Sequence, residues 1–180
     1  TGIGTAAQVQ STVIQNAEDT GLGALVLALI AICVLDLDTD TGDPAGLCLG
    51  GIHNGQIKHW KDINEVCKPL RDMGIEPIVL PAPDEIEAAK TACPDATHLP
   101  PTKLGTYAAL CQGAQIVIAN DSGISHIAAA AGAKQLTLIG VTRTDRTGPW
   151  NPKALTRGEE GRWPTVDEVI EAIKEIVNKE

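Results

Sequence analysis

Three polar side chains lie between an apolar run and an alanine-rich run in the segment IVIANDSGISHIAAAAG, residues 116–132. Asp121 and Ser122 can cap a helix that begins there, and Gly123 lets a ligand approach the backbone closely. The first turn of such a helix has unpaired N–H groups and a partial positive charge, which suits an anion such as phosphate. His126 would face the same end and can donate to phosphate or sugar oxygens. The pattern fits an anion site and a plain capped core helix equally well.

Three other segments carry groups able to reach the same ligand. In GGIHNGQIKHW, residues 50–60, Lys58 is either a phosphate partner or a solvated lysine on a helix-entry loop. In VLPAPDE, residues 79–85, Asp84 and Glu85 can accept hydrogen bonds from ribose hydroxyls or simply complement a helix dipole. The third segment, GVTRTDRTGPWNP, residues 140–152, lies either over a bound diphosphate or on the surface. Its polar residues are Thr142, Arg143, Thr144 and Arg146.

Strand-like and helix-like segments alternate along the chain and must position these groups. The predicted strands cover 46–52, 76–82, 114–120 and 134–140, and the predicted helices cover 61–74, 83–93, 102–113, 122–132 and 165–180. The last helix should begin with a capping box formed by Thr165 and Glu168. This alternation predicts an α/β fold, a Rossmann-like parallel sheet with helices on both faces. Ligands bind beyond the carboxyl ends of the strands in such folds, which is where the polar segments lie.

The first 45 residues have a different character. Val9, Val13, Ile14 and Ala17 fall at helical spacing and Gly21 would end that helix. The apolar run 21–35 is too short to span a bilayer and lacks a preceding basic residue, so we interpret it as a buried strand or a helix running into one. A turn-rich acidic linker follows. We therefore predict two units, 1–45 and 46–180, with the boundary at residues 36–45.

The amino-acid composition argues against some classes of function and limits which residues can form the core. The net charge of −9 argues against a nucleic-acid partner, because phosphate backbones require clustered Lys and Arg. With three Trp, one Tyr and no Phe, the core must consist of Ile, Val, Leu and Ala. The five cysteines show no CxxC or Cys/His ligand spacing and are predicted to be reduced, buried thiols of a cytosolic protein: Cys33, Cys48, Cys67, Cys93 and Cys111.

Rival motifs fit the sequence less well. TGIGTAA, residues 1–7, matches G-x-G-x-x-A but has no strand before it. In DLDTDTGD, residues 36–43, the glycine is one position late for an EF-hand, and Leu47 stands where the required Glu would be. Ser122 and His126 lie on one helical turn and are not poised as nucleophile and base. We predict no metal site.

The segment IVIANDSGISHIAAAAGAKQLTLIGVTRTDRTGP, residues 116–149, resembles the signature of glycosyltransferase family 9, the heptosyltransferase-like group. That pattern has D-S-G, two residues, His, then alanines and Gly, a strand, G-x-T and a later Pro. The lysine–tryptophan element at 58–60, the acidic helix start at Glu85 and the C-terminal helix also follow the family's order. The resemblance covers roughly residues 46–180 and implies the C-terminal, donor-binding half of a GT-B glycosyltransferase, here preceded by a short helix–strand remnant.

The resemblance also implies a ligand and a set of contacts. The ligand is a nucleotide-diphospho-sugar, ADP-heptose in the best-known members. Lys58 resembles the family's phosphate-binding lysine, and Glu85 its ribose-binding acid, with Glu87 as the alternative if the loop is shifted. The diphosphate and sugar loop would be Asp121, Ser122, Gly123 and His126. No metal or cofactor is implied, so Lys58 and the helix dipole would stabilise the leaving diphosphate.

The family's reaction is a direct, inverting displacement with a carboxylate as the base. The opening TGIGTAAQVQSTVIQ is similar to the family's first loop and helix, but Thr5 stands where the catalytic aspartate falls, and Ser11-Thr12-Val13 stands where Thr-Pro is usual. A threonine hydroxyl does not act as a base at neutral pH. The catalytic residue is therefore unassigned.

Two functions remain open at this point. The first is a reduced family 9 glycosyltransferase that binds a nucleotide-diphospho-sugar and transfers the sugar to a glycan or lipid-linked acceptor. The second is a non-catalytic nucleotide-sugar-binding module or assembly protein without the acceptor domain and base. A second chain or a homo-oligomer would be the possible partner, and the expected location is the cytoplasm, with peripheral association with the inner membrane left open.

Overall fold

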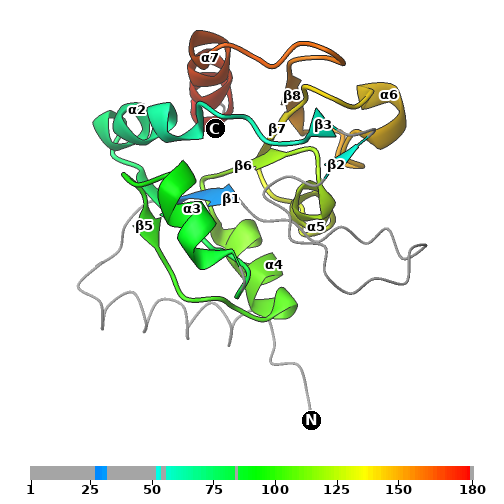
Figure 1. Ribbon diagram of the computed structural model, residues 1–180. Coiled ribbons are helices and arrows are strands. Elements are labelled where there is room, and N and C mark those ends of the chain that lie inside the picture. Colours follow the sequence, from blue (N-terminus) through cyan, green and yellow to red (C-terminus); the bar gives the residue numbers. More distant parts are fainter. Residues whose placement is uncertain (1–26, 32–51, 54–55, 84, 179–180) are drawn as a thin grey trace.

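The computed structural model describes residues 27–31, 52–53, 56–83 and 85–178, and a six-stranded sheet forms its centre (Figure 1). The strands are β1 (Leu27–Ala31), β4 (Glu76–Val79), β5 (Thr97–His98), β6 (Ile116–Asn120), β7 (Gln135–Leu138) and β8 (Leu155–Arg157). They lie in the order β5-β4-β1-β6-β7-β8, and every neighbouring pair is parallel. The order reverses between β1 and β6, as in doubly wound nucleotide-binding sheets. The predicted Rossmann-like α/β fold is confirmed.

Helices cover both faces of this sheet. On one face lie the 3-10 helix η1 (Ile63–Val66), α2 (Cys67–Asp72) and α7 (Val166–Val177), and on the other lie α4 (Leu104–Gly113) and α5 (Gly123–Ala130) (Figure 1). Strand β6 serves both layers, because successive side chains of a strand point to opposite faces. Ile116 and Ile118 belong to the core under α2 and α7, and Val117 and Ala119 to the core under α4 and α5.

Two further helices follow strands: α3 (Ile86–Ala92) comes after β4, and α6 (Thr144–Thr147) comes after β7. Helix α7 begins with the predicted capping box, in which Glu168 N donates to the Thr165 hydroxyl and Thr165 N donates to the Glu168 carboxylate. The buried core consists mainly of Ile, Val, Leu and Ala, as predicted, although Trp60 is among its largest buried side chains. Cys67, Cys93 and Cys111 are buried free thiols, also as predicted.

Short elements differ from the prediction. Of the strand predicted over 46–52, only Ile52 lies among the described residues, and it belongs to β2 (Ile52–His53), which pairs antiparallel with β3 (Gln56–Ile57). The residues between these strands are Asn-Gly, the pair most typical of a hairpin turn. Elements β5, β8 and α6 were not predicted, because two to four residues cannot show a period.

Strand β1 comes from the apolar run 21–35 and pairs with both β4 and β6. It therefore belongs to the same sheet as the strands of segment 46–180. The boundary predicted at 36–45, the helix predicted before Gly21 and the position of Thr5 all lie outside the described residues. Within the described ranges, no helix has the length and apolar character needed to cross a membrane.

Candidate functional site

The predicted site residues follow strands at the carboxyl edge of the sheet. Asp121 and Ser122 follow β6, Thr142 follows β7, and Glu85 follows β4. The strands are parallel, so these positions share one edge. Lys58 comes from outside the six-stranded sheet, because it follows the β2–β3 hairpin.

A buried hydrogen bond brings the Lys58 segment to the end of β6. Trp60 N donates to Asn120 Oδ1 over 3.1 Å, and Asn120 directly precedes Asp121. Lys58 is half-buried and lies two residues before this bond. His59 lies between Lys58 and Trp60 in the sequence. Burial lowers its pKa, and its Nδ1 is buried without a hydrogen-bond partner among the described residues. The bond between Trp60 and Asn120 brings the segment just after Lys58 to the end of β6, although sixty positions separate the two bonded residues in the sequence.

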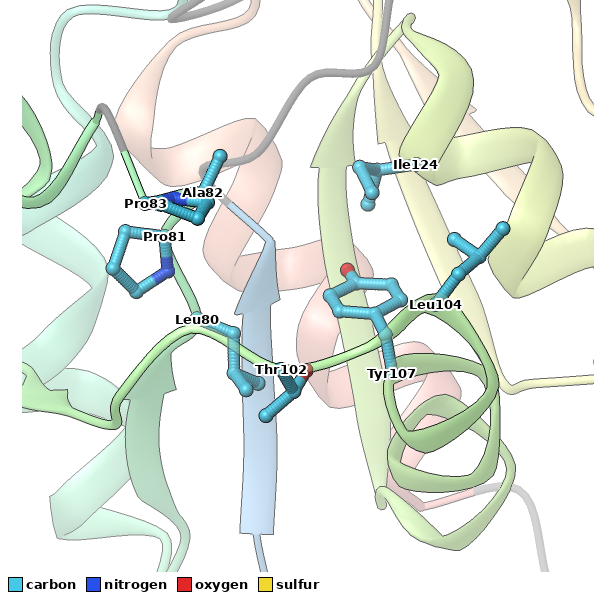
Figure 2. A pocket seen from close by; sticks show the side chains of 8 residues that line it. All are labelled: Leu80, Pro81, Ala82, Pro83, Thr102, Leu104, Tyr107 and Ile124. Carbon is cyan, nitrogen blue, oxygen red and sulfur yellow. The ribbon is translucent and has the colours of Figure 1, made fainter.

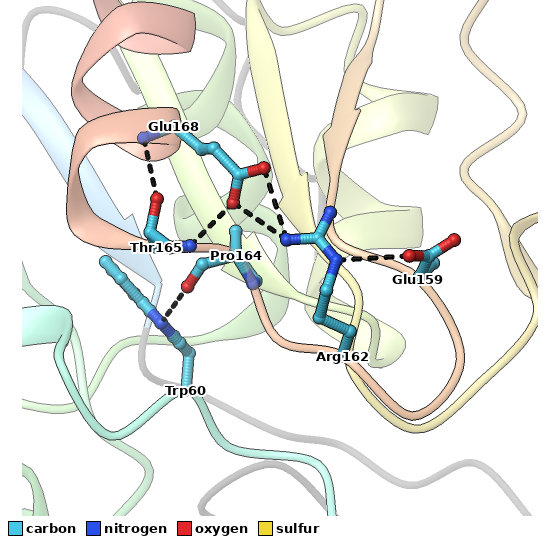
Figure 3. A network of polar contacts seen from close by, with 6 residues as sticks. All are labelled: Trp60, Glu159, Arg162, Pro164, Thr165 and Glu168. Carbon is cyan, nitrogen blue, oxygen red and sulfur yellow. Dashed lines mark hydrogen bonds and ion pairs between the residues drawn. The ribbon is translucent and has the colours of Figure 1, made fainter.

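The indole of Trp60 ties the same segment to the loop before α7. Its Nε1 donates to the Pro164 carbonyl over 3.0 Å (Figure 3). Beyond Pro164, Arg162 forms ion pairs with Glu159 at 3.1 Å and with Glu168 at 3.0 Å. The Thr165 N–H and the Arg162 guanidinium hold the pKa of Glu168 below its usual range. This network fixes the loop 158–165 against the start of α7.

The loop after β7 is fixed from two sides. Gly140 accepts a hydrogen bond from Gly161 N over 2.9 Å, and the ring of Trp163 packs directly on it. A Cβ atom at position 140 would lie 2.0 Å from Trp163 Cδ2, so only glycine fits here without a shift of the ring.

Asp121 holds this loop from the side of β6. It is 3% exposed, and its Oδ2 accepts from the hydroxyl of Thr142 and, over 2.6 Å, from that of Thr147. The carboxylate thus clamps the segment that ends in α6 onto the end of β6. Arg143 in this segment is exposed and paired with Asp145 at 2.8 Å.

The first turn of α5 is the predicted anion-binding element. Ser122 is buried and occupies the N-cap position in an extended conformation, but its side chain makes no capping hydrogen bond. Its carbonyl accepts from both the N–H and the hydroxyl of Ser125. Gly123 is half-buried, and His126 is exposed one turn into the helix. The sequence suggested a side-chain cap here, and the structure instead leaves this turn without one.

The two acidic candidates after β4 have different surroundings. Glu85 is 1% exposed and lies at the N-cap of α3, where its Oε2 is 3.5 Å from Ala82 N. Glu87 is exposed and forms an ion pair with Lys90 at 2.9 Å. The carboxylate of Glu85 therefore turns back toward its own loop, while that of Glu87 points to solvent.

An apolar pocket that sequence reasoning missed opens beside this loop (Figure 2). On one side lies the segment that follows β4, and on the other lie side chains from the starts of α4 and α5. Its lining residues are Leu80, Pro81, Ala82, Pro83, Thr102, Leu104, Tyr107 and Ile124. Ile124 immediately follows Gly123, so the pocket adjoins the first turn of α5. The proline pair after a buried strand was the available signal, since prolines there hold a loop open instead of continuing the strand.

No group of three or more His, Cys, Asp or Glu side chains in the described part of the chain could hold a metal ion.

Comparison with known proteins gives a family and a fold. The model of glycosyltransferase family 9 (heptosyltransferase) matches residues 39–174, well over half of the chain. No curated protein sequence matches the chain. Among solved structures, E. coli ADP-heptose LPS heptosyltransferase II is similar, with a TM-score of 0.70 and 18% identity over 99% of this chain and 53% of that protein.

Two other solved structures give the same result. E. coli heptosyltransferase WaaC with ADP has a TM-score of 0.62 and 24% identity over 85% of this chain and 45% of that one. The family 9 glycosyl transferase from Veillonella parvula has a TM-score of 0.69 and 16% identity over 97% of this chain and 52% of that one. The chain thus spans about half of the length of these proteins, and at these identities the similarity shows the fold alone.

Proposed function

The chain belongs to glycosyltransferase family 9, the heptosyltransferase family, and from this premise we propose that it binds a nucleotide-diphospho-sugar of the ADP-heptose type. One observation carries the proposal. The hydrogen bond from Trp60 N to Asn120 joins the segment that carries Lys58 to the end of β6, directly before the first turn of α5. A lysine cation and the N-terminus of a helix together favour a bound diphosphate.

The remaining contacts follow from the arrangement around this point. The diphosphate would lie against Ser122, Gly123 and Lys58, and the apolar pocket next to Ile124 would take the flat nucleobase, whose faces favour apolar and aromatic walls. His126 is exposed on the same turn and would donate to sugar hydroxyls. E. coli heptosyltransferase WaaC was solved with ADP and also with ADP-2-deoxy-2-fluoro heptose, which supports this choice of ligand.

The two carboxylates predicted to be ligand contacts have other roles in this proposal. Asp121 holds the loop after β7 through Thr142 and Thr147, and Glu85 is buried with its Oε2 3.5 Å from Ala82 N. The expectation that Glu85 accepts from the ribose stays a prediction. An E85Q variant tests it, because a ribose acceptor loses affinity for nucleotides but not for inorganic diphosphate.

For the reaction we propose metal-independent, inverting transfer of the sugar. Lys58 and the N-terminus of α5 would stabilise the negative charge that develops on the leaving diphosphate. A carboxylate would remove the acceptor proton, and Thr5 stands where the family has its aspartate, so this base must come from elsewhere. The alternative is a module that binds the donor and does not transfer the sugar.

Calorimetric titration with ADP, UDP and ADP-heptose tests binding. We expect ADP and ADP-heptose to bind, and a Lys58→Met variant to lose about 10- to 100-fold in affinity, the usual range for a hydrogen bond to a charged group. Lys134→Met is the matched control, because that lysine is exposed at the amino end of β7, the opposite edge of the sheet. If none of the three nucleotides binds to the folded chain, the proposed function is wrong.

Turnover requires a separate assay. ADP release from ADP-heptose, with and without lipid-linked and glycan acceptors, distinguishes a transferase from a binding module. Release that depends on acceptor supports transfer. Tight binding with no release under any condition supports the non-catalytic alternative.

A further inference from the structure

Two thiols that the proposed function does not use lie in contact in the core. The Sγ atoms of Cys67 and Cys93 are 3.4 Å apart, and both residues are 0% exposed. Cys67 is the first residue of α2, and Cys93 is the C-cap of α3, 26 positions later. A disulfide has an S–S distance of about 2.05 Å, so the two sulfurs need to approach by only about 1.4 Å.

The backbone on both sides of this pair is already held together. Asn64 Nδ2 donates to Asp95 Oδ2 over 2.8 Å, and Asp95 N donates back to Asn64 Oδ1 over 3.0 Å. These bonds join the segment just before Cys67 to the segment just after Cys93. A ring nitrogen of His98 also contacts the Cys93 carbonyl at 2.9 Å. The contacts on both sides therefore hold the two sulfurs next to each other.

The surroundings distinguish the two thiols chemically. The hydrogen bond between the two sulfurs lowers the pKa of Cys67, and Arg71, four residues further along α2, adds to this effect. The same hydrogen bond, together with burial, raises the pKa of Cys93. Cys67 is therefore favoured as the thiol that ionises first. Thiolate character decides which cysteine reacts with an oxidant.

We propose that Cys67 and Cys93 form a redox-active dithiol that a small hydroperoxide converts into a disulfide. The Cys67 thiolate attacks one peroxide oxygen, the O–O bond breaks, and sulfur gives up two electrons to form a sulfenic acid, while the other oxygen takes a proton and leaves as water or an alcohol. The Cys93 thiolate then attacks the Cys67 sulfur, forms the S–S bond and expels hydroxide, which leaves as water with the proton from Cys93. A small oxidant is required because both thiols are buried.

Peptide mapping of the native chain after treatment with hydrogen peroxide tests the proposal directly. Trypsin should release Cys67 in the peptide 62–71 and Cys93 in the peptide 91–103, each with a single cysteine. We expect these two peptides to be joined after oxidation and separated by dithiothreitol. Two unjoined peptides, or a link from either thiol to Cys33, Cys48 or Cys111, would overturn the proposal.

Variants test the order of the two steps. In Cys93→Ser the sulfenic acid on Cys67 has no thiol to react with, so dimedone should label Cys67. In Cys67→Ser, Cys93 should stay unlabelled. Cys111→Ser is the matched control: Cys111 is equally buried, on the opposite face of the sheet, and burial raises its pKa to about 12, so the 67–93 link should form as before. Equal labelling of both single variants contradicts the assignment of Cys67 as the nucleophile.

A stability readout does not depend on any variant. A link across 26 positions should favour the folded state by several hundred-fold in the unfolding equilibrium in the chain-entropy treatment. This corresponds to a rise of roughly 7–14 °C in Tm, reversed by dithiothreitol. A joined pair with an unchanged or lower Tm would show that the bond strains the fold, against the proposal that the fold is already built for it.

Discussion

Asp121 offers a sharp test of how the site is held together. The sequence predicts that it contacts the ligand, whereas in the structure it accepts hydrogen bonds that hold the loop after β7. Its Oδ2 accepts from the hydroxyls of Thr142 and Thr147 while the residue is 3% exposed. The perturbation is Asp121→Ala, with Asp121→Asn as the conservative form. Each hydrogen bond from a neutral donor to a charged acceptor contributes about 1.5–3 kcal/mol to stability.

The structure orders the expected losses. Asp121→Ala removes both hydrogen bonds and leaves the buried Thr142 hydroxyl without its partner, whereas the single hydroxyl proton of Thr147 can turn to the Arg143 carbonyl, 3.0 Å away. We expect a loss of roughly 3–5 kcal/mol for Asp121→Ala and about half of that for Asp121→Asn, whose amide oxygen still accepts. Thr142→Val should cost about 2 kcal/mol, and Thr147→Val about 1 kcal/mol.

Urea unfolding followed by circular dichroism measures these differences, with the m-value as the check that unfolding remains comparable. The matched control is Asp145→Ala in the same loop, whose carboxylate pairs with Arg143 in full solvent, and its unfolding midpoint should not change. An Asp121→Ala variant as stable as the unmodified chain would refute the clamp and return Asp121 to the role of a ligand contact alone.

Three further predictions concern the surroundings of the site. Gly140→Ala should destabilise the fold by about 1–3 kcal/mol, because its Cβ would overlap the ring of Trp163. Gly105→Ala, in open space on α4, should stabilise the fold slightly, and thermal unfolding measures both changes. Because burial lowers the pKa of His59, the unfolded state binds more protons, and stability should fall as pH drops below about 6.5; in His59→Gln this slope should be smaller. The double variant Trp60→Phe/Thr142→Val should lose less unfolding free energy than the sum of the losses of the two single variants. Strict additivity in this double-mutant cycle would contradict a shared network.

The sequence could predict features of the site that depend on neighbouring residues, but not contacts between residues far apart in the chain. The position of Asp121 and Ser122 at the end of a buried strand followed from the strand–helix alternation, because parallel strands place such junctions at one edge. The partners of Asp121 could not be predicted, because Thr142 and Thr147 lie 21 and 26 positions away and only the packing of β7 beside β6 selects them. A local pattern contains no information on which of several loop hydroxyls meets a carboxylate.

The burial of Glu85 could not be predicted from the sequence either. A glutamate at a helix start is normally exposed, since burial of a carboxylate is costly unless it is hydrogen-bonded. Here it is 1% exposed, at the N-cap of α3, with its Oε2 3.5 Å from Ala82 N. Ala82 also lines the apolar pocket, and neither this burial nor the pocket could be derived from the local sequence. The short strands β5 and β8 are likewise defined by pairing with longer neighbours and not by their own composition.

The contacts around the carboxyl edge of the sheet connect Trp60, the loop before α7 and the ends of β6 and β7 to one another. This affects how the proposed ligand would bind. Trp60 bonds the end of β6 through its backbone and the loop before α7 through its indole. That loop holds Gly140 at the end of β7, and the segment after Gly140 returns to β6 through the Asp121 clamp. All these contacts lie within the protein, so Trp60 and the ends of β6 and β7 are held together without a ligand. If the proposed diphosphate binds at this edge, little of its binding energy is needed to order these segments.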